Sequence, residues 1–550
     1  MDGSATQRAD VVIAGGGLAG IVTAYELLGA GHRVTLIDKD RRERFGGLAN
    51  EASGGMFMVG TPLQRRLGIV DSPELAWSDW QKVARYDASD AWPRQWGAFL
   101  CEHSVEHAFE FLRARKVRFM PIVIWAERGL CAKGNSVPRW HMVWGLGPEI
   151  IRRLVGALEA HPRRDRLEVL FDTEVCGLET TAGRVTGVRA RRVDGTREFQ
   201  VEAPNVVIAS GGMCGGDLST IRANWYRPWG EPPERLLNGA HSYADGQLHD
   251  RVSAIGGAVT HLDLQWLYAT GVNHPDKRRE HDGLSLVAPR SALWFDARGE
   301  RIMSPCPLPA HGDTRHVVAS VLGRPGQYSW QVMNWMIALR ELAGSGPRYQ
   351  TAIRDRSLLR FAATLVFGNR ADTRRLMREC SEDVVVADSL DELVAGMNLR
   401  SLYGLEVDGA RLARTVEAWD EMIDRGPSFH DDDQLRWIAE LRAYRGDRVR
   451  TCNFQKILDP NARPLVAVRE FPITRKSLGG IQTDLECRVL RASDGEPIAG
   501  LYAVGEAAGF GGGGAHGQGS LEGAFLTGCI LTGRAAGRSI ARGTTLSGGG

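Results

Sequence analysis

The segment from Asp10 to Asp38 constrains the fold more than any other part of this chain. It begins with DVVIAG, a short run of mostly β-branched residues typical of a buried parallel strand. The run leads into a G-x-G-x-x-G motif at residues 15–20, a helical pattern closed by Gly31, and a second strand, RVTLID, which ends at Asp38. This order of strand, glycine turn, helix, strand and acid predicts a βαβ unit that binds a dinucleotide.

The three glycines of this motif have distinct expected roles. Gly15 permits the tight turn, Gly17 lets a pyrophosphate approach the backbone, and Gly20 lets the helix pack closely on the strand. The N-terminus of the helix favours negative charge. Asp38 would accept hydrogen bonds from the ribose hydroxyls. The residues of this unit expected to contact the dinucleotide are Gly15, Gly17, Leu18, Ala19, Gly20, Asp38 and Lys39.

The sequence after Asp38 favours a flavin over a nicotinamide. The stretch KDRRERFGGLANEASGGMF has glycine pairs at 46–47 and 54–55, and a flavin ring that lies flat against backbone needs such a segment. Further on, RLEVLFDTEVCGLETTAGRVTGVRA predicts two strands and a turn, and APNVVIASGG predicts another buried strand that ends in glycines. These segments add the expected cofactor contacts Gly46, Gly47, Leu48, Ala49, Asn50, Ser53, Gly54, Gly55, Val175, Ala209, Ser210 and Gly211.

A second match to the same glycine spacing lies at residues 512–517, inside GFGGGGAHGQGSLEGAF (509–525). No strand with a terminal acid follows it before the chain ends. We therefore interpret the match as chance within glycine-rich sequence. Glycine density of this kind still indicates that something approaches the main chain closely, either the protein itself or a ligand.

Bulk properties set broad limits. A chain of 550 residues is long enough for two domains or for one discontinuous domain with an insertion. The formal net charge of +2 implies no polyanionic partner, and short basic clusters are usually solvated surfaces, so we exclude nucleic acid. The nine cysteines form no C-x-x-C pair, which favours reduced thiols and no metal site. We read no signal peptide and no membrane span, and expect a cytoplasmic protein.

Several motifs together resemble one known superfamily. The N-terminal unit, GGLANEASGG, VVIASGG, LGGIQTD and GLYAVGEAAGFGGGGAHGQGSLEGAFLTG occur in the order found in the FAD-dependent fumarate reductase and succinate dehydrogenase flavoproteins. ERGLCAKGNSVPRWHMVWGLG and SEDVVVADSL look closer to bacterial FAD-binding dehydrogenases allied to 3-ketosteroid dehydrogenases. The likeness covers nearly the entire chain.

This resemblance implies an α/β architecture: a discontinuous, Rossmann-like FAD-binding domain with an inserted α+β cap. Its expected parts are residues 1–287, a cap over residues 288–455 that begins with a hairpin in SALWFDARGERI, and a return to the FAD domain over 456–550. The active site would lie between cap and flavin. GGLANEASGG has no histidine where succinate dehydrogenases attach FAD covalently, so non-covalent FAD is expected.

The resemblance also assigns roles to the C-terminal glycine run. Gly505 and Glu506 would lie near the ribityl chain, and the run itself would pass under the flavin ring. Ser520 would cap a helix that starts near Leu521 and points toward the N1–C2=O edge, where negative charge collects on reduction. Fumarate reductases have a substrate-clamping arginine at the position of Ser520. Serine cannot replace that charge, so a C4 dicarboxylate substrate is disfavoured.

Four side chains are candidates for proton transfer or for binding a carbonyl oxygen. They are Tyr268, Arg475, His516 and His141. Each has a structural alternative: packing against Trp266 for the tyrosine and a surface position for the arginine. For His141 it is a loop position packed among Trp140 and Trp144, and for His516 a hydrogen bond to a nearby carbonyl. Arg475 stands in ITRKSLGGIQTD, whose counterpart borders the ring in this superfamily; Lys476 is near the ring there too, and Gly479 and Gly480 would offer backbone amides.

Three functions stay open at this point. The first is hydrogen transfer across a C–C bond next to a carbonyl, by hydride transfer at flavin N5, on a bulky polycyclic or steroid-like ketone. The second is fumarate-like reduction of a small unsaturated carboxylate. The third is a flavoprotein that carries electrons to a partner. The chain has no second dinucleotide unit for NAD(P)H, so an external electron acceptor or donor is expected, and the oligomeric state is open.

Overall fold

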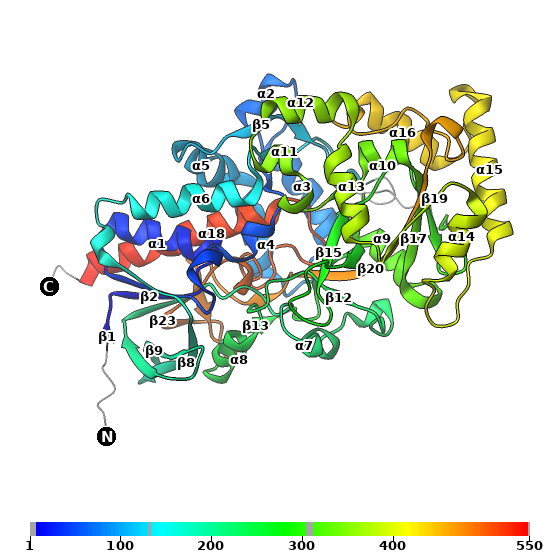
Figure 1. The fold of residues 1–550 in the computed structure, drawn as a ribbon. Helices are drawn as coiled ribbons and strands as arrows, with labels where there is room; N and C mark the ends of the chain where they lie inside the picture. The colour runs from blue at the N-terminus through cyan, green and yellow to red at the C-terminus, as the bar shows by residue number, and fades with distance from the viewer. Residues whose placement is uncertain (1–6, 130–133, 304–311, 548–550) are drawn as a thin grey trace.

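The computed structural model describes residues 7–129, 134–303 and 312–547 (Figure 1). Its first layer is a six-stranded sheet in the order β22-β23-β11-β2-β3-β7, in which β23, β11, β2, β3 and β7 run parallel. All four residues of β2 are buried, as the run of β-branched residues predicts. The strands are β2 (Val11–Ala14), β3 (Val34–Ile37), β7 (Leu167–Leu170), β11 (Asn205–Ile208), β22 (Arg488–Leu490) and β23 (Pro497–Ala503).

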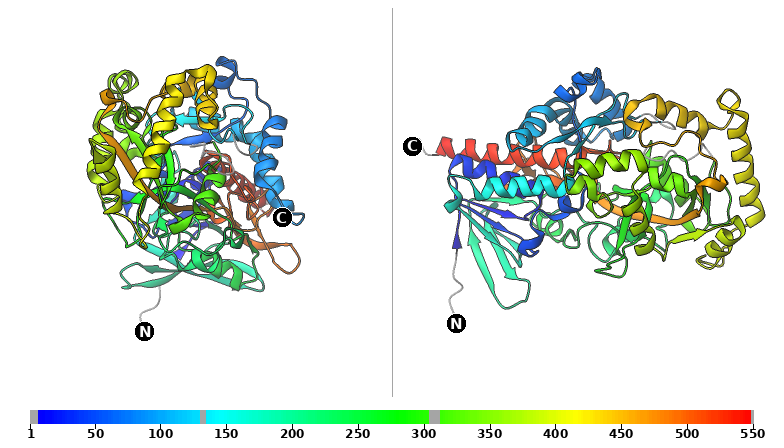
Figure 2. Two further views of the ribbon diagram at one scale, coloured as in Figure 1. Left: turned by 90° about the vertical axis from the view of Figure 1, so that its right-hand side faces the viewer. Right: turned by 45° about the horizontal axis from the view of Figure 1, so that its top comes forward.

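Three long helices cover one face of this sheet. Helix α1 (Leu18–Ala30) ends at Gly31, whose left-handed backbone (φ 92°) lets its N–H donate to the carbonyls of Leu27 and Leu28. The C-terminal helix α18 (Ala524–Ser547) lies along α1, and α6 (Leu146–Glu159) lies on the other side of α1 (Figures 1 and 2). The two ends of the chain thus complete one layer, which confirms the expected discontinuous α/β architecture.

A four-stranded sheet packs against the other side of the first layer, in the order β1-β10-β9-β8. Strands β8 and β9 form the predicted pair, joined by a turn at Ala182 and Gly183. This sheet contributes Val175 and its neighbours to the same buried cluster as β11 and β23. The strands are β1 (Gln7–Arg8), β8 (Thr173–Thr181), β9 (Arg184–Arg192) and β10 (Glu198–Glu202).

An eight-stranded sheet forms the other half of the molecule (Figure 1). Its central strand β20 pairs with four others, and the sheet includes strands on both sides of residues 288 and 455. The expected domain boundaries therefore cut through one continuous sheet. The strands are β12 (Leu237–Asn238), β14 (Gln265–Asn273), β15 (Gly283–Val287), β16 (Leu293–Asp296), β17 (Ser329–Asn334), β18 (Ala343–Gly344), β19 (Val384–Ala387) and β20 (Leu465–Ser477).

The expected hairpin in SALWFDARGERI is a tight turn at the end of β16. The N–H of Asp296 donates to the Glu300 carbonyl at 2.9 Å, and the N–H of Gly299 donates to the Asp296 carbonyl at 3.1 Å. Helices then cover the sheet. They are α9 (Thr314–Leu322), α10 (Trp335–Glu341), α11 (Thr351–Arg354), α12 (Leu358–Phe367), α13 (Arg370–Glu379), α14 (Leu390–Asn398), α15 (Gly409–Arg425), α16 (Asp433–Ala443) and α17 (Arg445–Arg448).

A smaller subregion from residues 55 to 143 lies beside both halves. It contains a three-stranded sheet, β4-β6-β5, and helices that include a π-helical segment after α4. Its elements are β4 (Gly55–Phe57), β5 (Phe119–Ile124), β6 (Trp140–Val143), α2 (Pro62–Arg66), α3 (Pro73–Ala84), α4 (Ala91–Ser104), the π-helix Val105–Glu110 and α5 (Phe111–Ala114). Beside β8 lies α8 (Gln247–Ala254), which contacts the small pair β13 (Val259–Thr260) and β21 (Gly480–Ile481).

Two general expectations can be compared with the described residues. None of the helices described there combines the length and apolar character needed to cross a bilayer. The cysteines at 101, 176, 214, 380, 452, 487 and 529 are free thiols, while Cys131 and Cys306 lie outside the described residues.

Candidate active site

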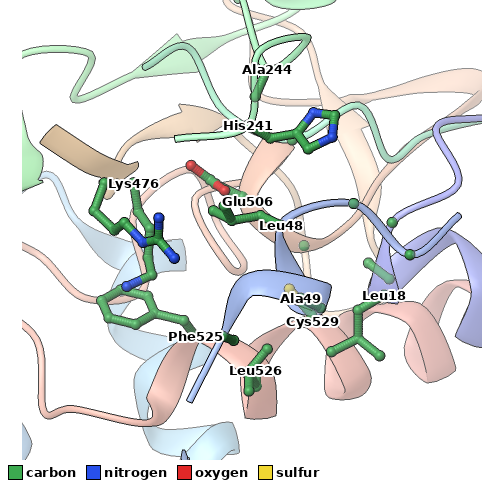
Figure 3. Close-up of a pocket in the computed structure, with 18 of the residues that line it drawn as sticks. Leu18, Leu48, Ala49, His241, Ala244, Lys476, Glu506, Phe525, Leu526 and Cys529 are labelled. Atoms are coloured by element: carbon green, nitrogen blue, oxygen red, sulfur yellow. The ribbon is translucent and has the colours of Figure 1, made fainter. Parts of the chain in front are cut away.

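A deep cavity runs from the G-x-G-x-x-G turn to the eight-stranded sheet. Its lining combines residues of the first and last parts of the chain with residues of β14, β15 and β20. Figure 3 shows Leu18 on one side of this cavity, Lys476 and Phe525 on the other, and Glu506 and Ala49 between them. The cavity therefore lies at the junction of the two halves, where ligand sites are common.

The glycine turn forms one end of the cavity. Gly15 has a φ of +118°, and a Cβ on it would lie 2.3 Å from the Ala209 carbonyl oxygen, so only glycine fits. Gly17 has no atom within 4 Å of its would-be Cβ and faces open space. No side chain caps α1, and the N–H groups of Ala19 and Gly20 donate no hydrogen bond among the described residues. These free donors at a helix N-terminus create a site for an anion.

Asp38 lies beside this turn, directly after β3. Its Oδ1 accepts a hydrogen bond from the Asp40 N–H at 3.1 Å, and burial raises the pKa of its carboxyl to about 6. Lys39 follows, and its ammonium group is shared by Glu174 at 3.0 Å and Asp245 at 3.3 Å. Asp38 lines the cavity, so hydroxyl groups of a ligand bound there would donate to its carboxylate.

Most of the residues expected to contact the cofactor line this cavity. Those that do are Gly15, Gly17, Leu18, Ala19, Asp38, Lys39, Gly46, Gly47, Leu48, Ala49, Ser53, Gly54, Gly55, Val175, Ala209, Ser210, Gly211, Gly505 and Glu506. Glu506 is held by the Ser477 N–H at 2.9 Å, and burial raises the pKa of its carboxyl to about 7. The sequence motifs thus identified one continuous surface.

Six expected contacts lie behind that surface. Gly20 packs its Cα against the Gly15 carbonyl, which is the close helix–strand packing predicted for it. Asn50 donates from Nδ2 to the Phe45 carbonyl at 2.8 Å. Gly479 and Gly480 face protein backbone, and Ser520 and Leu521 are buried in protein contacts. Their nearest neighbours include His261 O for Gly479, Ala507 O for Gly480 and His516 Nδ1 for Ser520.

The C-terminal glycine run differs from its expected role. A Cβ on Gly511 would lie 2.4 Å from the Trp96 ring, one on Gly512 would lie 2.6 Å from the Trp92 carbonyl carbon, and one on Gly517 would lie 2.3 Å from the Ala84 carbonyl oxygen. The run therefore packs against α3 and α4, and only Phe510 of residues 509–517 lines the cavity. Helix α18 also begins at Ala524, four residues after the expected cap Ser520. The cavity is still bordered by Gly523, just before this helix, and by Phe525 in its first turn.

The two candidate histidines lie outside the cavity lining. His141 is fully buried, with Nε2 2.8 Å from Thr61 Oγ1 and Nδ1 2.8 Å from the Arg139 carbonyl. Burial lowers the pKa of His141 to about 4 and that of His516 to about 3. His516 stacks on Trp80, and its Nδ1 lies 3.0 Å from Ser520 Oγ. Packing and internal hydrogen bonds explain both residues, so neither is retained as a catalytic candidate.

Tyr268 on β14 does line the cavity, within a hydrogen-bonded group that includes an acid and an amine. Its hydroxyl donates to Glu522 Oε1, which also accepts from Trp266 Nε1 at 3.0 Å. Lys476 Nζ donates to the Tyr268 hydroxyl oxygen at 3.3 Å and lies 4.0 Å from the centre of the Phe525 ring. Burial, reinforced by the Glu522 carboxylate, raises the pKa of Tyr268 well above its usual value.

Glu522 and Lys476 were not among the four predicted catalytic candidates. Glu522 follows the glycine run by a few residues, just before α18, and Lys476 is the neighbour of Arg475. An ionisable residue inside a glycine-rich motif is a signal that could have found Glu522. Burial lowers the pKa of Lys476 to about 8, so this amine changes charge near physiological pH.

Arg475 also lines the cavity, and its guanidinium contacts main chain. It donates to the Gly239 carbonyl and, at 3.4 Å, to the Glu51 carbonyl. These bonds tie β20 to the residue after β12 and to the segment that follows the first glycine pair. Arg475 therefore holds two walls of the cavity together.

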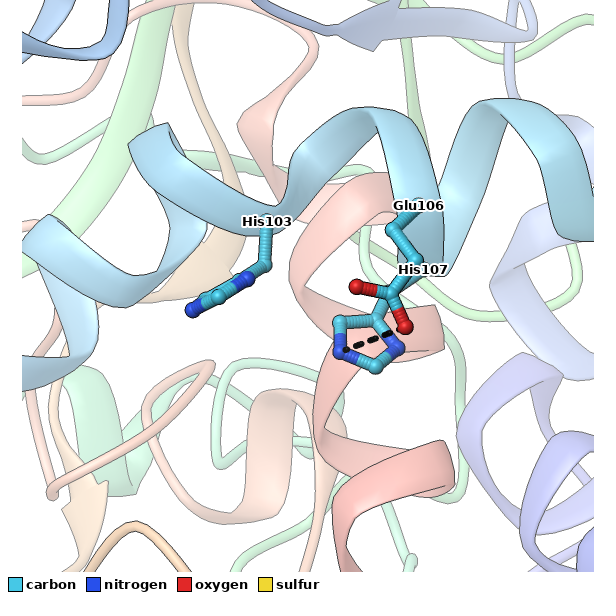
Figure 4. Close-up of side chains that lie close together, drawn as sticks. All are labelled: His103, Glu106 and His107. Carbon is cyan, nitrogen blue, oxygen red and sulfur yellow. Dashed lines mark ion pairs between the residues drawn. The ribbon is translucent and has the colours of Figure 1, made fainter.

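One further group of ionisable side chains lies away from the cavity, where α4 passes into the π-helix. His103, Glu106 and His107 offer atoms within 4.8 Å of one another (Figure 4). Arg538 lies 3.8 Å from Glu106, and Arg534 donates to the carbonyls of Glu106 and His107. Burial, followed by the charge of Arg534, lowers the pKa of His107 to about 4. Two neighbouring arginines disfavour a cation here, and no metal site is assigned.

The fold and cavity are those of a flavoprotein, and comparison with known proteins agrees. Residues 10–526 match the FAD binding domain family, to which this chain belongs. A KsdD-like steroid dehydrogenase of Mycobacterium tuberculosis is 39% identical, over 97% of this chain and 96% of the relative. The chain is an FAD-dependent oxidoreductase of the superfamily predicted from its motifs.

Two solved structures share the fold. One is a 3-ketosteroid-Δ4-(5α)-dehydrogenase of Rhodococcus jostii in complex with 4-androstene-3,17-dione, with a TM-score of 0.64, 22% identity and 98% of each chain covered. The other is a flavocytochrome c3 fumarate reductase, with a TM-score of 0.68, 21% identity, and 98% of this chain and 78% of that chain covered. At these identities the likeness extends to the fold alone.

Proposed function

We propose that this protein removes or adds hydrogen across a C–C bond next to the carbonyl of a bulky, steroid-like ketone. The observation that carries the proposal is the position of the Tyr268 hydroxyl, which borders the cavity between the Glu522 carboxylate and the Lys476 amine. The related M. tuberculosis protein, named a steroid dehydrogenase, supports the same substrate class.

The residues around the cavity fit FAD bound without a covalent link. The free N–H groups of α1 would hold the pyrophosphate, Asp38 the ribose, and the first turn of α18 the flavin edge that becomes negative on reduction. None of the residues 46–55 is a histidine that could form a covalent bond. When bound, FAD supplies hydride chemistry.

The protein's own contribution is proton transfer and exclusion of water. Tyr268 takes a proton from the substrate carbon beside the one that loses hydride, while its own hydroxyl proton moves to Glu522. Trp266 keeps Glu522 in place through its indole N–H. Lys476 donates a hydrogen bond to the Tyr268 hydroxyl oxygen. When Lys476 is protonated, its positive charge disfavours transfer of the substrate proton to Tyr268 and Glu522. In the reverse direction the same hydroxyl donates the proton.

The rest of the substrate side of the cavity suits an apolar polycycle. Its walls include side chains of β5, β6 and β15 and the segments next to them, and burial of such a surface drives binding of a rigid hydrocarbon. These wall residues are Ile124, Trp125, Trp140, Met142, Leu286 and Val287.

The other two functions have weaker support. Fumarate-like reduction lacks the substrate-clamping arginine, since Ser520 stands there and is hydrogen bonded to His516. A pure electron carrier needs no buried tyrosine, acid and amine at a ligand cavity. We assign re-oxidation of the reduced flavin to an external electron acceptor, because the sequence shows one dinucleotide unit and no second one for NAD(P)H.

The test is anaerobic mixing of the FAD-loaded protein with 3-ketosteroids and with fumarate. We expect a ketosteroid to bleach the visible flavin absorbance and fumarate to leave the prereduced protein reduced. Tyr268→Phe and Glu522→Gln should keep FAD and slow bleaching by about 10²–10⁴-fold, the usual range for a lost acid or base. Lys476→Met should remove a rise in rate that the wild type shows as pH passes about 8, where Lys476 loses its proton.

Two results would contradict this function. The first is a flavin that no ketosteroid reduces at any pH between roughly 6 and 9, the range in which Lys476 titrates. The second is a Tyr268→Phe variant that reduces its flavin as fast as the wild type. Turnover of fumarate by the prereduced protein would instead support the small-carboxylate alternative.

A further inference from the structure

A second polar cluster lines the same cavity, apart from the tyrosine group. It comes from the segment after β15 and from the segment after α17, and it includes two guanidinium groups, Arg290 and Arg450. Ser345 and Gln350 line the cavity as well, and the Gln350 amide donates to the Gly344 carbonyl at 2.8 Å. None of these four residues belongs to the dinucleotide end described above, so they act on whatever occupies the substrate side.

The two arginines differ in their partners. Arg290 donates from Nη2 to Asp447 Oδ1 at 2.8 Å and from Nη1 to the Arg450 carbonyl at 3.2 Å and to Thr451 Oγ1 at 3.3 Å. Arg128 takes the other oxygen of Asp447, at 3.8 Å. Arg290 thus has a structural counter-charge and holds the loop that carries Arg450.

Arg450 has no such partner. Among the described residues, no hydrogen bond or ion pair involves its guanidinium group, and it borders the cavity in a partly buried position. The nearest acids are occupied: Asp447 by two arginines, and Glu341 by the backbone N–H groups of Arg290, Ser291 and Cys452 and by the Ser291 hydroxyl.

An unpaired cation in this position is unfavourable without a ligand. Burial lowers the pKa of Arg450 to about 10, and the neighbouring charge of Arg290 adds to the shift. No hydrogen bond joins its guanidinium to the described residues, and the carboxylates of Asp447 and Glu341 act on it only through their charge. A direct partner for Arg450 therefore has to come from what binds in the cavity. A planar guanidinium matches the geometry of a carboxylate and binds it with two parallel hydrogen bonds.

We propose that the substrate carries a carboxylate that pairs with Arg450, so that this enzyme acts on a ketosteroid bearing an acidic side chain. The inference rests on the proposed function for the ketone part of the substrate. The proposed substrate thus has one charged group at Arg450, and the rest of its surface contacts the apolar walls described above. Arg290 positions Arg450 through the Arg450 carbonyl and shares no part of the carboxylate.

The experiment compares one 3-ketosteroid that carries a side-chain carboxylic acid with the methyl ester of the same compound. The FAD-loaded wild-type protein should prefer the acid by about tenfold to hundredfold, both in kcat/KM and in the dissociation constant from equilibrium dialysis. In Arg450→Met the ratio of acid to ester in kcat/KM should fall close to one, mainly because KM for the acid rises. The kcat/KM for the ester should stay unchanged. Arg450→Lys should restore part of the preference for the acid.

Arg445→Met is the matched control, because Arg445 is an exposed arginine on α17, five residues before Arg450. It should keep the preference of the wild type. Equal binding of acid and ester by the wild type, or a preference that survives in a folded Arg450→Met variant, overturns the inference.

Dialysis separates this inference from the proposed function. If the acid binds through Arg450 and no ketosteroid bleaches the flavin, the proposed chemistry fails and the carboxylate site stands. If neutral ketosteroids bleach the flavin and the acid gains nothing from Arg450, the chemistry stands and the carboxylate site fails. Binding of fumarate through Arg450, with no binding of the steroid acid, would also overturn the inference.

Discussion

Two segments of this chain carry the spacing G-x-G-x-x-G, at residues 15–20 and 512–517, and their surroundings differ. At the first, Gly17 faces open space at the start of a helix whose first N–H groups have no acceptor in the described part of the chain. At the second, would-be Cβ atoms on Gly512 and Gly517 meet the backbone of α4 and α3 at 2.6 and 2.3 Å. Glycine spacing alone therefore does not indicate a ligand site. An open face beside N–H groups of a helix that lack an acceptor does indicate one.

The largest expected effect comes from a charge placed at the open face. Gly17→Glu has room for its side chain, and its carboxylate would occupy the site of the pyrophosphate. We expect a folded protein that has lost FAD, with a dissociation constant raised at least about a hundredfold. Flavin absorbance of the purified protein and titration with FAD measure this, and circular dichroism checks the fold.

Gly29→Glu controls for the added charge, since Gly29 is an exposed position in α1 that also has no atom within 4 Å. This variant should bind FAD like the wild type. A Gly17→Glu protein as yellow as the wild type would remove the distinction between the two glycine segments.

The second prediction concerns the packed segment. Gly512→Ala places a Cβ against the Trp92–Pro93 backbone at a φ of +66°, and should lower the free energy of unfolding by about 2–4 kcal/mol. Folded molecules should still hold one FAD, because Gly512 does not line the cavity. Denaturant unfolding at saturating FAD gives the stability, and the flavin-to-protein absorbance ratio gives the occupancy.

Gly404→Ala measures the cost of the left-handed backbone without the steric clash. Gly404 has nearly the same φ, +67°, and no atom lies within 4 Å of its would-be Cβ. This variant should lose only about 1 kcal/mol, the contribution of the left-handed backbone. If Gly512→Ala lost FAD while remaining folded, the run would contact the cofactor after all.

The smallest effect concerns His516, the histidine inside the packed segment. Because burial holds its pKa at about 3, the folded protein keeps it neutral while the unfolded chain protonates it below about pH 6.5. Its stabilising contribution is therefore complete above pH 6.5 and falls as pH drops toward 3, by about 2 kcal/mol at pH 5. His516→Phe should flatten that part of the stability curve.

The measurement is denaturant unfolding of both proteins between about pH 5 and 7, across the window in which the unfolded histidine titrates. His103→Phe, at a partly exposed histidine of α4, controls for loss of a histidine as such. His516→Phe should also reduce its flavin with substrate as fast as the wild type. A large loss of that rate, with FAD retained, would return His516 to the catalytic candidates.

The parts of the site that sequence motifs located are local in the chain. Asp38 and Gly17 lie within one strand–helix–strand unit, and the positions of both follow from the glycine turn and the second strand. The tyrosine group is different. Tyr268 is 254 residues from Glu522 and 208 residues from Lys476, so no spacing rule relates them. Tyr268 could be singled out by resemblance, whereas its acid partner could not.

The same contrast explains the two histidines and Arg450. His141 and His516 stand in motifs that border the cavity, and neighbouring residues do line it: Trp140 and Met142 beside the first, Phe510 and Phe525 near the second. In a strand, successive side chains point to opposite faces, which is why His141 turns away while Trp140 and Met142 face the cavity. Arg450 stands in no motif, and the packing of α17 against β5 together with the hydrogen bond from Arg290 to its carbonyl brings it to the cavity.

By itself the sequence determined the dinucleotide unit, because short-range turn, helix and strand preferences encode it. The flavin, the discontinuous α/β architecture and the superfamily followed from further glycine motifs and their resemblance to known flavoproteins. The tertiary structure alone decided which glycines face a ligand, which histidines are packed away, and which acid, amine and arginine meet at the cavity. Those outcomes depend on contacts between residues hundreds of positions apart, and local backbone preferences carry no information about such contacts.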